Sequence, residues 1–304
     1  MKKILIGSML LVLTLTLAAC GGNKTSADGG EVFEYGAQTY SDPKIMGHIV
    51  KLLVEDQTDH EVEVTEDIQA SPQILGALDK GEFDFATLYS GEVYNNHFDE
   101  DKVEFSTDPD KTMEQAQKLF GDKYNVKWYD TTGFTNQYSI AVKQDFADEN
   151  NIETLTELGV YAPDMKVGAD SAWKERANDG YRDFVKAYGY EFGDVNGMEI
   201  SLMYEGIAGG ELDAITAYTV DPHILENDLV VLEDDKNFFA PYQGSIVAKN
   251  EVLDEYPEVK EVLDSIVGLV STDEMTELIR EVDINERKIP EVAKEFLQEK
   301  DMLD

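Results

Sequence analysis

Four tyrosines stand where strands are expected to begin or end, and their placement suits a cation-binding cage. Tyr89 and Tyr218 each close a predicted buried strand, Tyr138 begins another strand, and Tyr242 follows an aromatic segment ending in Pro241. An aromatic ring attracts a cation through its negative face, worth about 0.5–2 kcal/mol, but cannot neutralise it. Such a cage fits a quaternary ammonium group, which has no hydrogen to donate. Any one of the 15 tyrosines is better explained as an ordinary core or surface residue, so the hypothesis rests on their joint placement.

Two of these tyrosines end copies of one nine-residue pattern. Gly81–Tyr89 and Gly210–Tyr218 share Gly, Glu, Asp, Thr and Tyr at the same five offsets. Each copy predicts a helix that stops at glycine, a short buried strand and a terminal tyrosine. Ligands of open α/β sheets lie beyond the carboxyl ends of strands, so two related lobes would each direct one tyrosine into a shared cleft. The alternative is a chance echo of common turn residues.

The order of predicted elements alternates strand and helix in both halves of the chain. This order predicts an α/β fold with two lobes and mostly parallel sheets. We expect residues 31–132 and 238–304 to form lobe I and residues 133–237 to form lobe II. The chain would then cross one hinge region twice, which implies a cleft that closes on its ligand.

The N-terminus has the features of a lipoprotein signal. Lys2 and Lys3 precede an apolar stretch, shorter than the roughly 20 residues of a spanning helix, and Leu17-Ala18-Ala19-Cys20 forms a small-residue cleavage site. We therefore expect residues 1–19 to be a signal peptide, Cys20 to be lipidated, and residues 20–30 to be a flexible leader. Acyl chains on Cys20 would hold the protein at the cell membrane, on its extracytoplasmic face.

Composition and motif content argue against several other functions. With 25 basic and 63 acidic residues, the net charge of −38 disfavours nucleic acid as a partner. The four histidines show no metal-ligand spacing, and there is no nucleophile elbow or phosphate-binding glycine loop. We therefore predict no catalytic residue, metal or cofactor. An enzyme on the same two-lobed scaffold, or an envelope sensor or adhesin, remains an alternative.

The chain resembles the glycine betaine/carnitine/choline-binding lipoproteins of ABC osmolyte importers. The resemblance runs in order from about Phe33 to the C-terminus and rests on these segments: Gly36-Ala37-Gln38-Thr39-Tyr40, Leu88-Tyr89-Ser90-Gly91-Glu92, Gly133-Phe134-Thr135-Asn136-Gln137-Tyr138, Ala217-Tyr218-Thr219-Val220-Asp221, and Leu232-Glu233-Asp234-Asp235-Lys236-Asn237-Phe238-Phe239-Ala240-Pro241-Tyr242. It implies a type II periplasmic-binding-protein-like fold, a membrane permease as partner and a role in osmoprotection. It also implies a trimethylammonium cage of Tyr89, Tyr138, Tyr218 and Tyr242, with Gln38 at the polar end of the ligand.

The sequence departs from the family pattern next to the first cage tyrosine. The family usually has Arg before that tyrosine and Thr three positions after it, where this chain has Leu88 and Glu92, and its Asn-Asn pair is only partly kept, at Asn136. A glutamate near the ligand's polar end would repel a carboxylate and would accept a hydrogen bond from a hydroxyl. We therefore expect choline rather than glycine betaine or carnitine, unless Glu92 simply joins the acidic surface.

Overall fold

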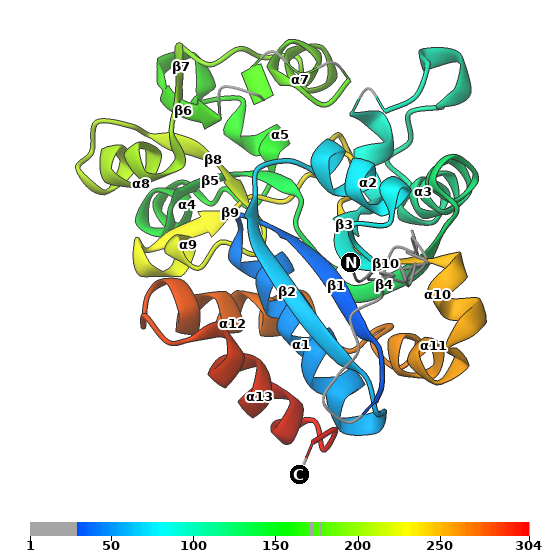
Figure 1. The fold of residues 1–304 in the computed structure, drawn as a ribbon. Coiled ribbons are helices and arrows are strands. Elements are labelled where there is room, and N and C mark those ends of the chain that lie inside the picture. Colours follow the sequence, from blue (N-terminus) through cyan, green and yellow to red (C-terminus); the bar gives the residue numbers. More distant parts are fainter. Residues whose placement is uncertain (1–28, 96, 171–172, 175, 177, 304) are drawn as a thin grey trace, which may run out of the picture.

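The computed structural model describes residues 29–303 apart from positions 96, 171, 172, 175 and 177. Within this part, the strands form two five-stranded sheets, each with its own helices (Figure 1). We call the part built on the first sheet lobe I and the part built on the second sheet lobe II. The predicted two-lobed α/β fold is confirmed. Cys20 and the predicted signal peptide lie outside the described residues, and the exact lobe boundaries stay a prediction.

The sheet of lobe I combines parallel and antiparallel strands. β1 pairs in parallel with β2 and β3, whereas β10 runs antiparallel to β3 and β4. Because β4 and β3 both run antiparallel to β10, four of the five described strands point the same way, which confirms the expected mostly parallel sheet. β10 is the reversed strand, because it follows the return of the chain from lobe II and begins at the edge where β3 ends. In spatial order the strands are β2 (Glu61–Ile68), β1 (Val32–Gln38), β3 (Phe85–Tyr89), β10 (Gln243–Lys249) and β4 (Val126–Thr135).

The sheet of lobe II repeats this arrangement. β6 pairs in parallel with β7 and β8, and β5 lies antiparallel between β8 and β9. The strand that enters lobe II from lobe I thus takes the antiparallel position, as β10 does in lobe I. The spatial order is β7 (Asp194–Met198), β6 (Lys166–Asp170), β8 (Ala214–Tyr218), β5 (Tyr138–Lys143) and β9 (Leu229–Val231).

Helices cover both sheets, and capping side chains mark where some of them begin. The capping box of Ser271 and Glu274 starts α12, and Asp108 caps the amino end of α3. Lobe I contains α1 (Ser41–Gln57), α2 (Ser71–Lys80), η1 (Ser90–Tyr94), η2 (Glu100–Lys102), α3 (Pro109–Tyr124), α10 (Asn250–Glu255), α11 (Pro257–Asp264), α12 (Thr272–Asp283) and α13 (Ile289–Glu299). Lobe II contains α4 (Gln144–Asn150), α5 (Leu155–Leu158), η3 (Ala162–Asp164), α7 (Tyr181–Tyr188), α8 (Ile200–Ala208) and α9 (His223–Glu226).

The repeated sequence pattern corresponds to a repeated structure. Gly81 follows α2 with φ 72°, and Gly210 follows α8 with φ 74°, a left-handed conformation that favours glycine. Each copy then continues into a strand, β3 or β8, that lies beside an antiparallel strand and ends at Tyr89 or Tyr218.

The repeated aspartates anchor these strands to their neighbours. Asp84 Oδ2 accepts a 2.9 Å hydrogen bond from the amide of Glu34 in β1. Asp213 Oδ2 accepts one of 2.8 Å from the amide of Lys166 at the start of β6. The same contact in both lobes fixes the register of the repeat strand, which supports a shared design rather than a chance echo.

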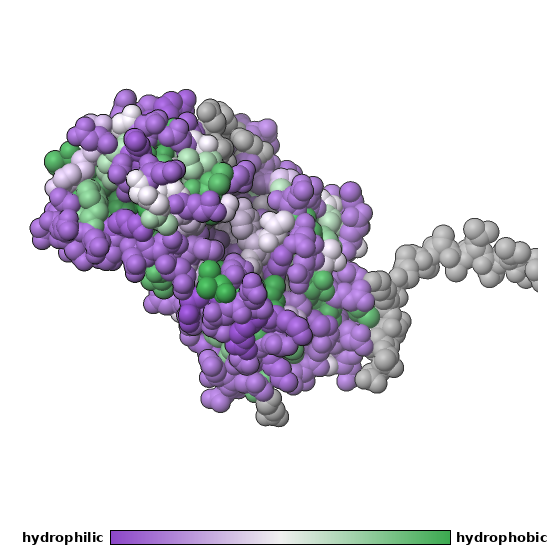
Figure 2. All heavy atoms as spheres, turned by 90° about the vertical axis from the view of Figure 1, so that its left-hand side faces the viewer, coloured by the Kyte–Doolittle hydropathy of each residue, from purple (hydrophilic) through white to green (hydrophobic). Residues whose placement is uncertain are grey.

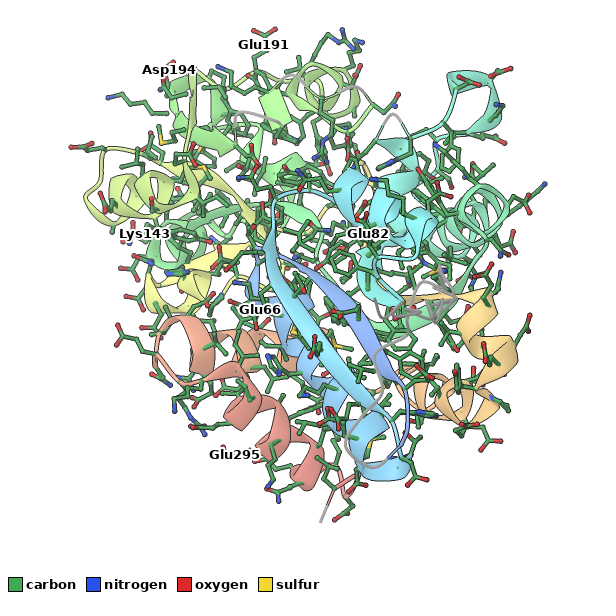
Figure 3. The ribbon with its side chains drawn as sticks, viewed as in Figure 1. Glu66, Glu82, Lys143, Glu191, Asp194 and Glu295 are labelled. Atoms are coloured by element: carbon green, nitrogen blue, oxygen red, sulfur yellow. The ribbon has the colours of Figure 1, made fainter. Side chains whose placement is uncertain are left out.

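The packing and the surface have different character. One side of α1 packs into the core of lobe I, where it buries Ile45, Met46, Ile49 and Leu53. The outer surface is mostly hydrophilic (Figure 2), and charged side chains such as Glu82, Glu191 and Glu295 point outward (Figure 3). Among the helices of the described residues, we find none long and apolar enough to cross a membrane.

We predict that Gly133→Ala destabilises the protein. Gly133 has φ +118°, and an added Cβ would lie 2.6 Å from the carbonyl oxygen of Val270. Strain and crowding should together lower the free energy of unfolding by about 1–3 kcal/mol. Gly76→Ala is the matched control, because this helical glycine has open space around it and should gain roughly 0.5–1 kcal/mol. Thermal melting of both variants measures the difference, and equal melting points would contradict the strain argument.

Candidate functional site

A cavity of about 350 Å³ lies between the lobes and is lined by residues from both. Its walls are formed where strands begin and end, which is the edge at which ligands of α/β proteins bind. Its lining includes every residue that the sequence predicted for ligand binding: Gln38, Tyr89, Glu92, Asn136, Tyr138, Tyr218 and Tyr242. The structure thus gathers these residues in one place; their binding of a ligand stays a prediction.

Strand direction explains how the four tyrosines meet. Tyr89 is the last residue of β3, and Tyr218 is the last residue of β8. Tyr138 begins β5, which runs antiparallel to β8, so Tyr138 pairs directly with Tyr218. Tyr242 comes just before β10, which runs antiparallel to β3, so it lies at the end of the strand that carries Tyr89. All four rings therefore reach the cavity, two from an edge of each sheet.

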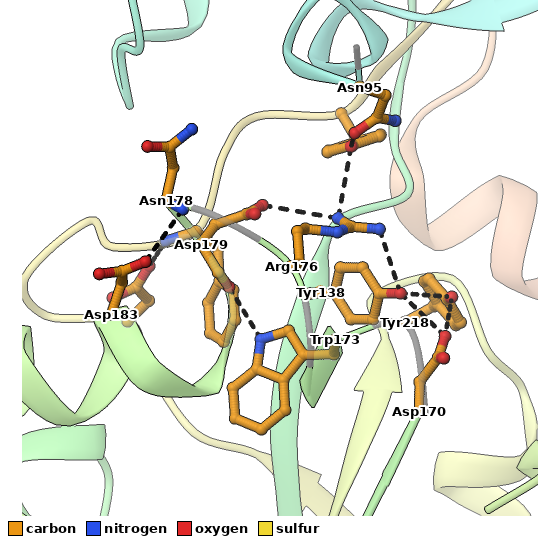
Figure 4. Close-up of polar contacts among 12 residues, drawn as sticks. Asn95, Tyr138, Asp170, Trp173, Arg176, Asn178, Asp179, Asp183 and Tyr218 are labelled. Atoms are coloured by element: carbon orange, nitrogen blue, oxygen red, sulfur yellow. Dashed lines mark hydrogen bonds and ion pairs between the residues drawn. The ribbon is translucent and has the colours of Figure 1, made fainter. Parts of the chain in front are cut away.

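The two tyrosines of lobe II are held as a pair by a carboxylate (Figure 4). The ring centroids of Tyr138 and Tyr218 are 4.8 Å apart with 36° between their planes. Both hydroxyls donate to Asp170 Oδ2, at 2.8 Å from Tyr138 and 3.0 Å from Tyr218. Burial raises the pKa of both phenols, so they remain neutral donors.

Tyr89 of lobe I has a matching carboxylate partner. Its hydroxyl donates to Asp42 Oδ2, which also accepts a 2.9 Å bond from Asn136 Nδ2. Burial raises the pKa of Asp42, and the bonds from Tyr89 and Asn136 partly offset this rise. The amide oxygen of Asn136 has no hydrogen-bond partner among the described residues, which leaves an acceptor beside the cage.

Arg176 places a positive charge inside the cage. Its guanidinium carbon lies 4.6 Å from the ring centre of Tyr138 and 5.9 Å from that of Tyr242. Its Nη1 is 3.6 Å from Asp179 Oδ2 (Figure 4). The guanidinium demonstrates that these rings can accommodate a cation.

Glu92 is buried at the cavity wall, with 3% of its surface exposed. The alternative that it joins the acidic outer surface is therefore wrong. Its Oε2 makes no hydrogen bond with the described residues, and His97 Nε2 lies 3.8 Å away. Burial raises the pKa of Glu92 to about 7, and Ser71, the Tyr89 backbone and Gln38 partly offset this effect. Glu92 thus offers an unsatisfied carboxylate oxygen in a site that changes charge near neutral pH.

The sequence analysis missed Asp42, Asp170 and Arg176. In the sequence, Asp42 looks like an ordinary residue at the start of a helix, and Arg176 lies in a loop without a recognisable motif. Asp170 had a usable signal, because it ends β6 beside β8 and so must reach the edge that carries Tyr218. Among the described residues, we find no group of three or more metal-ligating side chains.

Comparison with known proteins gives consistent matches. A family model described as the substrate-binding domain of ABC-type glycine betaine transport systems matches residues 34–299. The carnitine transport binding protein OpuCC of Listeria monocytogenes is 32% identical over 295 residues, covering 97% of this chain and 95% of that protein. The ergothioneine transport permease/ergothioneine binding protein EgtU of Helicobacter pylori is 30% identical over 264 residues, covering 85% of this chain and 46% of that protein. A crystal structure of a glycine betaine/carnitine/choline ABC transporter is 33% identical, with a TM-score of 0.82, and covers 90% of this chain and 100% of that chain.

We predict that Tyr218→Ala weakens the binding of a quaternary ammonium compound by about tenfold or more, the equivalent of about 1.4 kcal/mol. Tyr218→Phe should cost less, because the ring face remains. Calorimetric titration measures both effects. Tyr161→Ala, which removes a partly buried ring of lobe II outside the cavity lining, controls for lost stability. If Tyr89→Ala and Tyr218→Ala both bind like the parent, the cage is not the binding site.

Proposed function

Since the chain belongs to the family of substrate-binding domains of ABC-type glycine betaine transport systems, we propose that it captures choline in the tyrosine cage for delivery to a membrane permease. The observation that carries this proposal is the cavity itself, where four tyrosines surround one space and Glu92 lines its wall. The family consists of substrate-binding proteins of importers, so the enzyme alternative is set aside. A small quaternary ammonium ligand follows from the family, whereas choline is the specific part of the proposal.

The charge of the cavity supports a ligand that is positive overall. Its lining carries four carboxylates, Asp42, Glu92, Asp221 and Asp283, against Arg176 and His223. A ligand carboxylate about 4 Å from ionised Glu92 would cost on the order of 4 kcal/mol at an effective dielectric of 20. The hydroxyl of choline would instead donate to the unsatisfied Oε2 of Glu92, in a charge-assisted hydrogen bond.

Arg176 favours a second candidate, a zwitterion such as glycine betaine or carnitine. A guanidinium binds a carboxylate through two parallel hydrogen bonds, and Arg176 is already inside the cavity. Protonation of Glu92 would remove its charge repulsion with the carboxylate of such a ligand. The choice between the two candidates therefore depends on whether Glu92 or Arg176 faces the polar end of the ligand.

A thermal-shift screen shows which of these ligands the protein binds. It also distinguishes a binding protein from a sensor or adhesin that has no small-molecule site. Choline, glycine betaine, carnitine and ergothioneine would be tested singly, because relatives of this chain carry several of these names. A ligand at 100 times its dissociation constant adds about 2.7 kcal/mol to the free energy of unfolding. Stabilisation by none of the four compounds would contradict the proposed function.

We predict that Glu92→Thr changes the ligand preference. The parent should bind choline more tightly than glycine betaine, and the variant should gain glycine betaine affinity by about two to three decades, since roughly 4 kcal/mol of repulsion is removed. Calorimetric titration of both ligands measures the change. Glu82→Thr is the matched control, because Glu82 is exposed on lobe I and lies outside the cavity lining. Tight glycine betaine binding by the parent that is unchanged in Glu92→Thr would refute the role of Glu92.

We also predict opposite pH dependences for the two ligands. Because the pKa of Glu92 is raised to about 7, its carboxylate is ionised above that pH and neutral below it. Choline affinity should therefore fall as the pH drops through 7, and glycine betaine affinity should rise. Protonation of nearby His97, whose pKa burial lowers, would act in the same direction at still lower pH. Calorimetric titrations of the parent and of Glu92→Thr at several pH values test whether Glu92 causes this pH dependence. If the affinities of the variant still change with pH, another group is responsible.

We further propose that Cys20 carries the lipid anchor, as its cleavage pattern predicts. Cys20→Ser should leave the protein unlipidated, either retained with its signal peptide or shed from the membrane. Membrane fractionation with mass spectrometry of the N-terminus checks both results, and Ser26→Ala in the leader serves as the control. Normal anchoring of Cys20→Ser would contradict the lipoprotein assignment.

A further inference from the structure

We propose that Asp170 is a positioning residue that fixes and polarises the tyrosine pair of lobe II for a cationic ligand, and that Asp42 does the same for Tyr89 in lobe I. The proposal rests on the cation-binding function proposed above. It assigns roles to two carboxylates that act through phenol hydroxyls. It also explains why acidic side chains accept hydrogen bonds from the hydroxyls of rings that have no charge of their own.

The hydrogen-bond geometry of Asp170 carries the first step. One oxygen, Oδ2, accepts from both Tyr138 and Tyr218, and the two hydroxyls are 3.1 Å from each other. The amide of Asp170 donates to Thr216 Oγ1 at 2.9 Å, which fixes the end of β6 against β8. Each ring is thus held at its hydroxyl by Asp170 and at its backbone by the β5–β8 register. Rings held at both ends lose little freedom when a ligand binds.

The charge of the carboxylate adds to this mechanical effect. A phenol that donates to a carboxylate is polarised, so its ring face becomes more attractive to a cation. Asp170 is not among the described residues that line the cavity, so its charge lies behind the rings. It can therefore raise affinity for a cation without touching the ligand. A neutral ligand of the same shape would gain only from the fixed ring positions.

Asp42 repeats the arrangement from the other lobe. It lies in the first turn of α1, is 2% exposed, and accepts from the hydroxyl of Tyr89 and the amide of Asn136. Because Asp42 also lines the cavity, it is positioned to act on a ligand directly as well. Asp170 therefore gives the cleaner test. Tyr242 differs, because its hydroxyl donates to Asn95 Oδ1 at 3.2 Å and, among the described residues, to no carboxylate.

The test is a double-mutant cycle read by calorimetry. Asp170→Asn keeps the size of the side chain and removes its charge, and we expect it to weaken choline binding by about tenfold, or about 1.4 kcal/mol. Binding of 3,3-dimethylbutan-1-ol, the uncharged isostere of choline, should fall by a smaller factor. In a background of Tyr138→Phe with Tyr218→Phe, Asp170→Asn should change choline affinity by less than about threefold, because the hydroxyls it acts through are absent.

Asp194→Asn is the matched control, because it removes one exposed carboxylate from β7 of the same sheet. It should bind choline like the parent. Thermal melting verifies that each variant is folded. The proposal is overturned if Asp170→Asn binds choline like the parent, or if it loses the same factor in the double phenylalanine background.

A second readout needs no ligand and separates this proposal from the proposed function. With isotope-labelled tyrosine, the nuclear magnetic resonance signals of the hydroxyl-bearing ring carbons report the hydrogen bonds of Tyr138 and Tyr218, assigned through the phenylalanine variants. Asp170→Asn should shift these two signals, and Asp194→Asn should leave them in place. Unshifted signals overturn the positioning role of Asp170. If Asp170→Asn shifts these signals but the parent protein binds no quaternary ammonium compound, the positioning role stands and the proposed function is contradicted.

Discussion

The site depends on one constraint of sheet geometry: an antiparallel strand begins at the edge where its neighbour ends. β5 therefore starts with Tyr138 opposite Tyr218, the last residue of β8. β10 likewise follows Tyr242 and lies beside β3, which ends at Tyr89. In an all-parallel sheet the starting residues would lie at the far edge, and two of the four rings would be lost from the cavity. The reversed strand of each sheet, which the sequence analysis did not identify, thus completes the cage.

The cavity uses its carboxylates in two different ways. Asp42 and Asp170 accept hydrogen bonds from tyrosine hydroxyls, so Oδ2 of each is already engaged. Glu92 keeps one buried oxygen without a partner among the described residues. A buried acceptor without a partner costs stability unless a bound molecule satisfies it. We therefore propose that the engaged carboxylates serve the cage and that Glu92 selects the polar end of the ligand.

Much of this arrangement follows from local signals in the sequence. The Gly81 and Gly210 copies of the repeat predicted a helix stop, a strand and a terminal tyrosine, and the structure has these elements at those positions. The sequence did not indicate which strands are antiparallel, because that depends on how the chain returns between lobes. It also left the burial of Glu92 open, since a glutamate on a short turn after a strand is usually exposed. The structure buries it next to Ser71 and Gln38, which come from other elements, and no local pattern reveals this.

The two crossings between the lobes lie next to the cage, which couples ligand contact to lobe arrangement. Tyr138 stands three residues after the end of β4 at Thr135, and Tyr242 directly precedes β10. The crossings contact each other, because the amide of Asn136 donates to the carbonyl of Tyr242 at 2.8 Å. Asn136 also binds Asp42, so one amide side chain links a crossing to the carboxylate that holds Tyr89. A ligand that contacts rings from both lobes must therefore favour the lobe arrangement in which these rings converge, and its affinity includes the free energy of that closure.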